Sequence, residues 1–337
     1  MAMRGLFPLH PISTAAGAAA SDRLLFLPPL PTPDLAESSA GIDVGNRKLL
    51  RDLSTFGIGG PCSFFIEATR PAHLISAARL ARSRSLPLLI LGRGSNCLFS
   101  DRGFDGLVVL NRSSIDETVE VVGPGRVRVG SGYPFNRLGV RTAVEGWGGL
   151  EFAGGIPGTV GGAAFMNAGA NGQETAEVVE SVEVVNREGE IRVLGKEDLK
   201  FGYRWSSLQE MDDLAGILAV TFRLRPAPAA RNRQREFLER RRKTQPISER
   251  SAGSVFRNPV SCGVAAGQLI DIAGLKGCVI GGAKVSELHA NFIINTGGAT
   301  AKDVLALIAF VKDKVDRMFG IELKEEIRYV PYSSAQE

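Results

Sequence analysis

The sequence predicts an α+β protein built from more than one domain. Its 337 residues exceed the usual size of a single hydrophobic core, so two or three domains are expected. From Asn46 onward, short apolar runs alternate with turn residues, a pattern typical of many strands. The segment "RPAPAA", residues 225–230, interrupts this pattern, and a second α/β unit follows it to about Val330.

The elements of the first part follow in order. Apolar residues recur at helical spacing over residues 71–85, and Arg82 and Arg84 suit a helix C-terminus. The next segment, "LPLLILGRGSNCLF", predicts a buried strand at residues 88–91 that ends in a glycine turn. Further strands are predicted by the runs "GLVVL", "VRVG", "VESVEVVN", "IRVLG" and "ILAVTFRL".

The segment "RNRQREFLERRRKTQP", residues 231–246, predicts a basic helix after the break. It could bind nucleic acid or present a solvated face. Phe237 and Leu238 leave only a thin apolar stripe, and Glu236 and Glu239 interrupt the positive charge, which favours the solvated face. The net charge of +4 also lacks the bias usual in nucleic-acid binders, although it suits a small anionic substrate. We therefore expect no nucleic-acid partner.

The composition argues against three further classes of protein. No apolar run approaches the about 18 to 20 residues that span a bilayer, so no membrane association is expected. The four cysteines form neither close pairs nor a dense framework, which indicates reduced thiols. With only three histidines, a histidine-rich metal site is disfavoured, and no metal is predicted.

The N-terminus resembles a removable leader. Residues 1–21 contain Arg4, several Ala, Ser and Thr residues and no acid, and a proline-rich spacer continues to Gly41. This composition is typical of an organelle transit peptide, and the alternative is a disordered tail without an address. A secretory signal fits worse, because no apolar segment of about 7 to 15 residues follows the basic residue.

Two glycine-rich stretches are the strongest chemical signal. In "GRGSN" a strand runs into Gly92 and Gly94, whose freedom at positive φ lets successive backbone N–H groups converge on an anion. A second stretch, residues 149–172, holds one charged side chain, Glu151, and could bring another bare backbone surface to the same ligand. Neither stretch matches GxGxxG or GxxxxGK[ST], which disfavours Rossmann and P-loop sites. Two such loops indicate a long, doubly charged ligand such as a dinucleotide, although tight turns in a β-rich domain are an alternative.

Six motifs in order carry a family resemblance: "GRGSNCLFSD", "GLEFAGGIPGTVGGAAFMNAG", "FGYRWSSL", "SAGSVFRNP", "GGAKVSELHANFIIN" and "LKEEIRYV". They resemble the UDP-N-acetylenolpyruvoylglucosamine reductases (UDP-N-acetylmuramate dehydrogenases), flavoenzymes of peptidoglycan precursor synthesis. The chain resembles the compact branch, which lacks an extra tyrosine-bearing loop. The resemblance implies a two-lobed FAD-binding domain of the vanillyl-alcohol-oxidase/PCMH type and a separate C-terminal α/β substrate domain.

The resemblance, which runs from about Asn46 to Val330, also implies cofactors and, together with the leader composition, the following domain bounds. We expect a transit peptide and spacer at residues 1–41, the FAD-binding domain at 46–226, the substrate-binding domain at 231–330 and a tail at 331–337. FAD is expected to bind without a covalent bond, with NADPH as reductant. The residues expected to hold FAD are Gly92, Gly94, Ser95, Asn96, Gly154, Gly155, Ile156, Pro157, Gly158, Thr159 and Gly161.

The family reaction implies three catalytic residues. NADPH reduces FAD, and hydride then passes to the vinyl carbon of UDP-N-acetylglucosamine enolpyruvate while the adjacent carbon is protonated. Arg204 matches the arginine beside the substrate carboxylate, and Ser254 matches the proton donor, although each could instead be an ordinary turn residue. Glu326 matches the terminal glutamate, with Glu325 as its rival. Alternation along a strand puts these two on opposite faces, so only one can point into the cleft.

Substrate contacts and location complete the expectations. The residues expected to bind substrate are Tyr203, Asn258, Lys284, Ser286, His289 and Asn291, and His289 could equally be a core histidine. Lys284, Asn171 and Ser54 depart from the usual family residues. A monomer in the plastid stroma is expected, with the mitochondrion as the alternative. Another FAD-dependent oxidoreductase of the same fold remains the second hypothesis for function.

Overall fold

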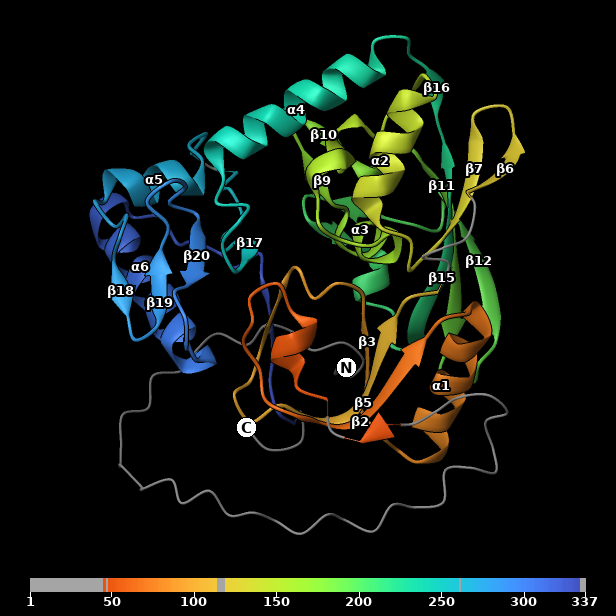
Figure 1. Ribbon diagram of the computed structural model, residues 1–337, viewed down its shortest axis with the longest axis horizontal. Helices are drawn as coiled ribbons and strands as arrows, with labels where there is room; N and C mark the ends of the chain where they lie inside the picture. The colour runs from red at the N-terminus through yellow and green to blue at the C-terminus, as the bar shows by residue number, and fades with distance from the viewer. Residues whose placement is uncertain (1–44, 47, 114–118, 261, 334–337) are drawn as a thin grey trace.

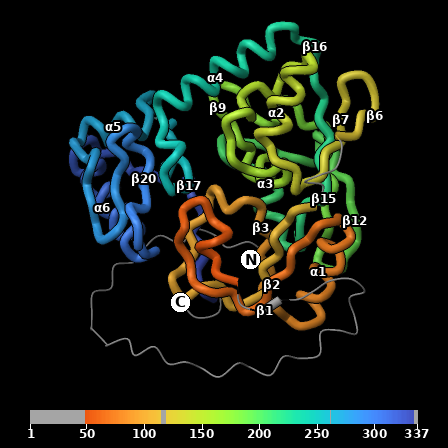
Figure 2. Tube along the Cα trace, in the orientation of Figure 1, coloured from red at the N-terminus to blue at the C-terminus, as the bar shows by residue number. Residues whose placement is uncertain are grey.

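The computed structural model describes residues 45–46, 48–113, 119–260 and 262–333. The predicted leader, residues 1–41, and the end of the predicted tail lie outside the described residues. Figures 1 and 2 show three units: the first in orange, the second in yellow and green, and the third in blue. The long helix α4 runs from the second unit to the third.

The first unit is a four-stranded sheet in the order β1-β2-β5-β3, with β2, β5 and β3 parallel. The strand β5 is buried at nearly every position because strands flank it on both sides. Its elements are β1 (Gly45–Asn46), η1 (Leu50–Leu53), β2 (Cys62–Ala68), α1 (Pro71–Ser83), β3 (Leu88–Leu91), β4 (Cys97–Phe99) and β5 (Phe104–Asn111).

The second unit is a five-stranded antiparallel sheet in the order β12-β11-β15-β7-β6. Leu74 and Ala77 of α1 share a core with Val185 and Leu218 of this sheet, so α1 joins the first two units. The sheet strands are β6 (Glu120–Gly123), β7 (Arg126–Gly130), β11 (Val179–Asn186), β12 (Ile191–Gly195) and β15 (Leu214–Arg223). The helices are α2 (Phe135–Val144), η2 (Glu151–Gly155), α3 (Val160–Met166), η3 (Thr175–Glu177) and η4 (Ser207–Gln209). Short strands form three further two-stranded sheets: β8 (Trp147–Gly148) with β16 (Arg225–Pro226), β9 (Gly169–Ala170) with β10 (Gln173–Glu174), and β13 (Phe201–Gly202) with β14 (Trp205–Ser206).

The third unit packs the sheet β17-β20-β19-β18 against α6. Thr300 and Asp303 form a capping box at the start of α6, and Gly320 ends the helix in the left-handed conformation. Its elements, with the preceding helix, are α4 (Ala230–Thr244), β17 (Ser251–Ser254), α5 (Ala266–Ile272), β18 (Val279–Ile280), β19 (Ala283–Val285), β20 (Phe292–Asn295), α6 (Ala301–Phe319) and β21 (Arg328–Val330).

The end of the described chain returns to the first unit. The strand β21 pairs in parallel with β4, and Phe56 and Leu98 from the first unit pack in the core of the third. The Asp101 carboxylate accepts hydrogen bonds from the backbone N–H groups of Ala301 (2.8 Å) and Lys302 (3.2 Å) at the start of α6. The first and third units are therefore joined by a strand pair, a shared core and a helix cap.

The basic helix α4 is mostly exposed, as expected of a solvated face, but residues on its inner side make contacts that were not expected. It contacts α2 and η2, and Gln234 and Arg241 turn toward the glycine-rich stretch, where an ideal Cβ on Gly154 or Gly155 would meet them at 2.5 and 2.8 Å. Burial lowers the pKa of Arg241. Gln234 and Arg241 follow the helical period, but the many charged residues around Phe237 conceal this inward stripe in the sequence.

Among the described residues, no helix is long and apolar enough to cross a membrane. Within the same part of the chain, no group of three or more His, Cys, Asp or Glu side chains is placed to hold a metal ion.

Candidate active site

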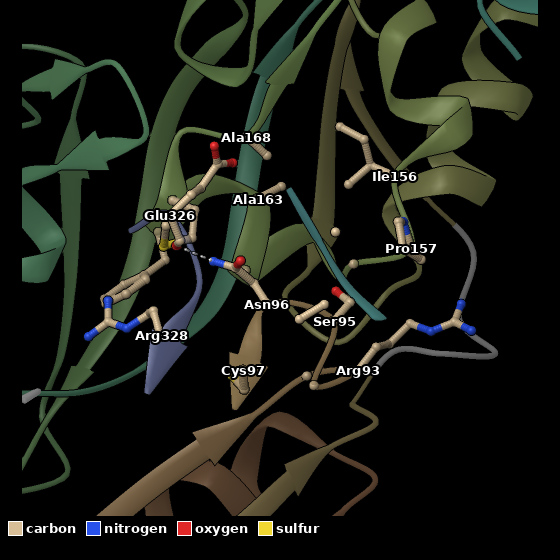
Figure 3. Close-up of a pocket in the computed structure, with 18 of the residues that line it drawn as sticks. Arg93, Ser95, Asn96, Cys97, Ile156, Pro157, Ala163, Ala168, Glu326 and Arg328 are labelled. Atoms are coloured by element: carbon tan, nitrogen blue, oxygen red, sulfur yellow. Dashed lines mark hydrogen bonds between the residues drawn. The ribbon is translucent and has the colours of Figure 1, made fainter. Parts of the chain in front are cut away.

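A cavity of about 1530 Å³ lies where the three units meet. Both glycine stretches line it, as do Arg204, Ser254 and Glu326. Figure 3 shows Ser95 of the first stretch, Ile156 and Pro157 of the second, and Glu326 and Arg328 from the last part of the chain around the same space. The volume exceeds the ~300 to 1,000 Å³ typical of a pocket for one small molecule, so it suits a dinucleotide together with a second ligand.

The first glycine stretch begins where β3 ends. Gly94 has φ +58°, and an ideal Cβ there would lie 2.3 Å from the Leu53 carbonyl oxygen. A Cβ on Gly92 would lie 2.6 Å from Thr159 Oγ1, which belongs to the second stretch. Both positions therefore require glycine. The absence of a side chain at Gly92 lets the first stretch contact Thr159 of the second.

The second stretch passes through η2 into α3. Thr159 caps α3 by accepting a hydrogen bond from the Gly162 N–H (3.3 Å), and Pro157 lies just before it along the cavity wall. All the residues expected to hold FAD line the cavity except Gly154, which instead faces Gln234. A wall of bare backbone from both stretches fits the pyrophosphate and ring of a flavin dinucleotide.

Buried Glu151 fixes the start of this stretch. Its carboxylate accepts hydrogen bonds from Gly149 N (2.6 Å) and Gln173 Nε2 (3.3 Å) and pairs with Arg233 of α4 (3.2 Å). The one charged residue of the glycine-rich stretch therefore holds α4 against the cavity.

Arg204 and Glu326 meet across the cavity. Arg204 Nε lies 2.7 Å from Glu326 Oε1, and Arg204 Nη2 donates to the Gly169 carbonyl (2.9 Å). Arg204 has φ +57°, an uncommon conformation for a residue other than glycine, in the turn between β13 and β14. Burial raises the pKa of Glu326 although Arg204 opposes that shift. The cavity thus holds a fixed cation beside a carboxyl group that retains its proton to a higher pH than usual.

Ser254 lies next to this pair at the end of β17. The Glu326 N–H donates to the Val255 carbonyl (2.7 Å), and the Asn96 side chain donates to the Glu326 carbonyl (3.2 Å; dashed in Figure 3). Glu325 turns the other way and pairs with Lys312 of α6 (2.9 Å). The two glutamates point apart as expected, but they precede the strand β21, and Glu325 forms an isolated bridge with Phe256 instead.

The comparisons with known proteins agree on one family. The family model described as "UDP-N-acetylenolpyruvoylglucosamine reductase, C-terminal domain" matches residues 245–330, and that described as "FAD binding domain" matches residues 62–195. The UDP-N-acetylenolpyruvoylglucosamine reductase of Protochlamydia amoebophila is 49% identical, with 86% of this chain and 94% of the relative covered. The chain belongs to the UDP-N-acetylenolpyruvoylglucosamine reductase family.

Two further relatives of this family extend the comparison. The reductase of Chlamydia pneumoniae is 45% identical over 84% of this chain and 90% of its own. The crystal structure of the reductase from Thermus caldophilus is similar with a TM-score of 0.72 and 36% identity, covering 86% of this chain and all of that one. The predicted FAD-binding domain of the PCMH type, followed by the C-terminal domain of this reductase family, is confirmed.

The residues expected to bind substrate divide into two groups. Asn258, His289 and Asn291 line the cavity, whereas Tyr203, Lys284 and Ser286 lie outside its lining. Lys284 pairs with Glu287, and the buried Ser286 hydroxyl accepts from the N–H groups of Leu288 and His289. The motif "GGAKVSELHANFIIN" contains many polar residues. The sequence alone therefore does not distinguish those that form turns from those that face a ligand.

Three of these side chains have defined structural contacts. Tyr203 remains at the cavity margin, where its hydroxyl accepts from Asn258 N–H at 3.4 Å. The Asn291 amide exchanges hydrogen bonds with the backbone of Phe256, two residues from Ser254. His289 Nδ1 accepts from Asn291 N–H (3.2 Å), so the ring proton is on Nε2, and burial lowers its pKa.

Sequence reasoning missed several residues of the cavity. Arg241 Nε and Gln245 Oε1 line it and are buried without a hydrogen-bond partner. Arg328 lies over the Phe165 ring, with 5.0 Å from Cζ to the ring centroid. Beside Arg328, burial raises the pKa of Cys97 to about 11. The helical spacing of Gln234, Arg241 and Gln245 was the available signal, but the surrounding charges obscured it.

Proposed function

We propose that this protein catalyses the NADPH-dependent reduction of UDP-N-acetylglucosamine enolpyruvate to UDP-N-acetylmuramate with FAD. The observation that carries the proposal is the cluster of Arg204, Glu326 and Ser254 on the cavity that both glycine stretches line. FAD would be held by Gly92, Gly94, Ser95, Asn96, residues 155–159 and Gly161. When bound, the flavin supplies hydride transfer from NADPH to the vinyl carbon of the substrate.

The residues of the chain would stabilise the negative charge and donate the proton in this reaction. Hydride addition places negative charge on the enolpyruvyl carboxylate, and the fixed Arg204 guanidinium is suited to bind that group. Ser254 then donates a proton to the carbon beside the carboxylate. Serine is a weak acid, so this step relies on its placement beside the developing carbanion and near Glu326.

Three polar side chains suit the diphosphates of both substrates. Arg241, Gln245 and Lys276 line the cavity, and the buried Arg241 Nε and Gln245 Oε1 have no protein partner. Both NADPH and the UDP-sugar carry a diphosphate, so the same cation can serve each ligand in turn.

The direct test is steady-state NADPH oxidation with and without the UDP-enolpyruvyl sugar, with the product identified by mass. Sugar-dependent oxidation and a gain of two hydrogens in the product are expected. Flavin reduction by NADPH without turnover of the sugar would instead support another FAD-dependent oxidoreductase of this fold. Acid denaturation should release free flavin, because FAD is proposed to be bound non-covalently.

We also propose that the acid-poor leader directs the chain to the plastid stroma. Its composition supports an organelle address, and peptidoglycan chemistry has a plausible place in a plastid. A reporter fused to residues 1–41 should be imported into plastids of plant cells. Import into mitochondria, or a cytosolic reporter, would contradict the proposal.

A further inference from the structure

Asn167 ends α3 next to the active site and is fully buried. It has φ +44°, so it adopts the left-handed conformation without being glycine. Asparagine tolerates this conformation better than most residues, but glycine would do so at lower cost. The presence of asparagine in place of glycine at this position indicates a specific role for the carboxamide.

The Asn167 carboxamide makes three hydrogen bonds that use both of its N–H donors and its oxygen. Nδ2 donates to Glu174 Oε2 (2.9 Å) and to the Gly202 carbonyl (2.8 Å), while Oδ1 accepts from Ala176 N–H (2.9 Å). Only a side chain with two donors and an acceptor in one plane can make these three contacts. The amide thus joins α3 to the hairpin that carries Arg204.

Two routes lead from Asn167 to Arg204. The first is the backbone, because Gly202 ends the strand β13 two residues before Arg204. The second is Glu174, whose Oε1 lies 3.8 Å from Arg204 Nη1 while its Oε2 accepts from Asn167. One carboxylate therefore connects the buried amide to the guanidinium.

The end of α3 also holds the other strand of the hairpin. The Phe165 carbonyl accepts from Ser206 Oγ (2.7 Å) and Gln209 Nε2 (2.8 Å), on the far side of the turn. Arg204 itself sits at φ +57° in a two-residue turn, a conformation that persists only where neighbours fix it. Asn167 and Phe165 fix the strands on either side of that turn.

We propose that Asn167 is a positioning residue for Arg204. Its carboxamide fixes the turn that carries Arg204 and orients the Glu174 carboxylate against the guanidinium. The inference rests on the proposed function insofar as Arg204 binds the substrate carboxylate. It assigns to Asn167 an effect on the oxidation of reduced flavin by the sugar, with no effect on flavin reduction by NADPH.

Asn167→Asp tests this directly, because a carboxylate there would face both the Glu174 carboxylate and the Gly202 carbonyl. We expect the second half-reaction to slow by about 10²-fold, the loss associated with misplacing a reacting group by roughly 1 Å. Flavin content and the first half-reaction should not change. Equal slowing of both half-reactions, or slowing of neither, overturns the proposal.

A compensating change separates positioning from general damage. In the double variant Asn167→Asp with Glu174→Gln, the new glutamine amide can donate to the new carboxylate, so part of the lost rate should return. Asn167→Gly keeps the left-handed backbone but removes the amide, and it should also slow the second half-reaction. No recovery in the double variant, or a normal rate in the glycine variant, contradicts the proposal.

Asn186 provides a matched control. This buried asparagine donates to Glu190 Oε2 (2.8 Å) and accepts from backbone N–H groups in the turn after β11. Asn186→Asp creates the same repulsion beside a glutamate, and both half-reactions should keep their wild-type rates. If it slows the second half-reaction as much as Asn167→Asp does, the effect is not specific to Arg204.

A structural readout distinguishes this inference from the proposed function. In a crystal structure of Asn167→Asp, Arg204 Nη2 should have left the Gly169 carbonyl, which it contacts at 2.9 Å in the wild type. An unmoved Arg204 overturns the inference. If the wild type does not turn over the sugar, the proposed function fails, and this geometric result still decides the role of Asn167.

Discussion

The Arg204 guanidinium and the Glu326 carboxylate form an ion pair at 2.7 Å, with side chains that are 17% and 16% exposed. They come from positions 122 residues apart in the chain. The pair places an obligate cation next to a carboxyl group whose ionisation is disfavoured by burial. The site thus offers one fixed positive charge, and the carboxylate of the proposed substrate would compete with Glu326 for Arg204.

The raised pKa of Glu326 predicts a pH-dependent stability difference. Its carboxyl favours the folded state most fully below the ordinary glutamate pKa of about 4.3, and that contribution is lost as the pH rises through the raised value. Relative to wild type, Glu326→Gln should therefore gain stability as the pH rises above about 4.3. Thermal unfolding of both proteins across this range measures the difference. A constant difference, or one that changes in favour of the wild type, would show that the sign is wrong.

Replacing Gly94 should disrupt flavin binding. An alanine there must adopt φ +58° and would bring Cβ to 2.3 Å from a backbone oxygen, so the loop must shift. The conformation alone costs about 1–2 kcal/mol, and the clash adds to this. Purified Gly94→Ala should have a lower flavin content and a lower melting temperature than the wild type.

Gly146→Ala is the control for the Gly94→Ala variant. Gly146 has φ +82° but open space around its Cβ position, so only the conformational cost applies. This variant should retain its full flavin content. Equal flavin loss in both variants would mean that the contact at Gly94 is unimportant.

Arg241→Ala should weaken binding of NADPH and of the UDP-sugar together. Loss of a charged hydrogen bond worth about 1.5–3 kcal/mol raises each KM by about 10- to 100-fold, while kcat should change little. Arg242→Ala is the matched control, because the neighbouring Arg242 is exposed. Steady-state kinetics of both variants measure these KM values. A change in KM for only one substrate, or an equal change in Arg242→Ala, would contradict the proposal that Arg241 binds both diphosphates.

Elements with strong local signals could be predicted from the sequence. The strand β3 occupies residues 88–91 as predicted, because a continuous apolar run lies between Pro87 and Gly92. The helix α1 begins at Pro71 but ends at Ser83, two residues early, since Ser85 adopts φ +51°. Local chemistry determined both elements.

The arrangement of the site depended on contacts between distant segments. The position of Arg241 against Gly155 arises from packing of α4 on η2, and the helical spacing of the inward residues alone does not identify the surface that they contact. In the same way, the buried Ser286 hydroxyl completes a turn, and Lys284 pairs with Glu287, although both lie in a motif shared with His289. Sequence identified the family and the glycine stretches, whereas burial and hydrogen bonding separated cavity residues from structural ones.

Ser254 is proposed to supply the proton in the second half-reaction, and stopped-flow kinetics of the Ser254→Ala variant measure this role. General acid catalysis contributes about 10² to 10⁴-fold, so oxidation of the reduced flavin by the UDP-enolpyruvyl sugar should slow by that factor. Flavin reduction by NADPH requires no such proton and should proceed at the wild-type rate. A variant that oxidises its reduced flavin as fast as the wild type would contradict the account.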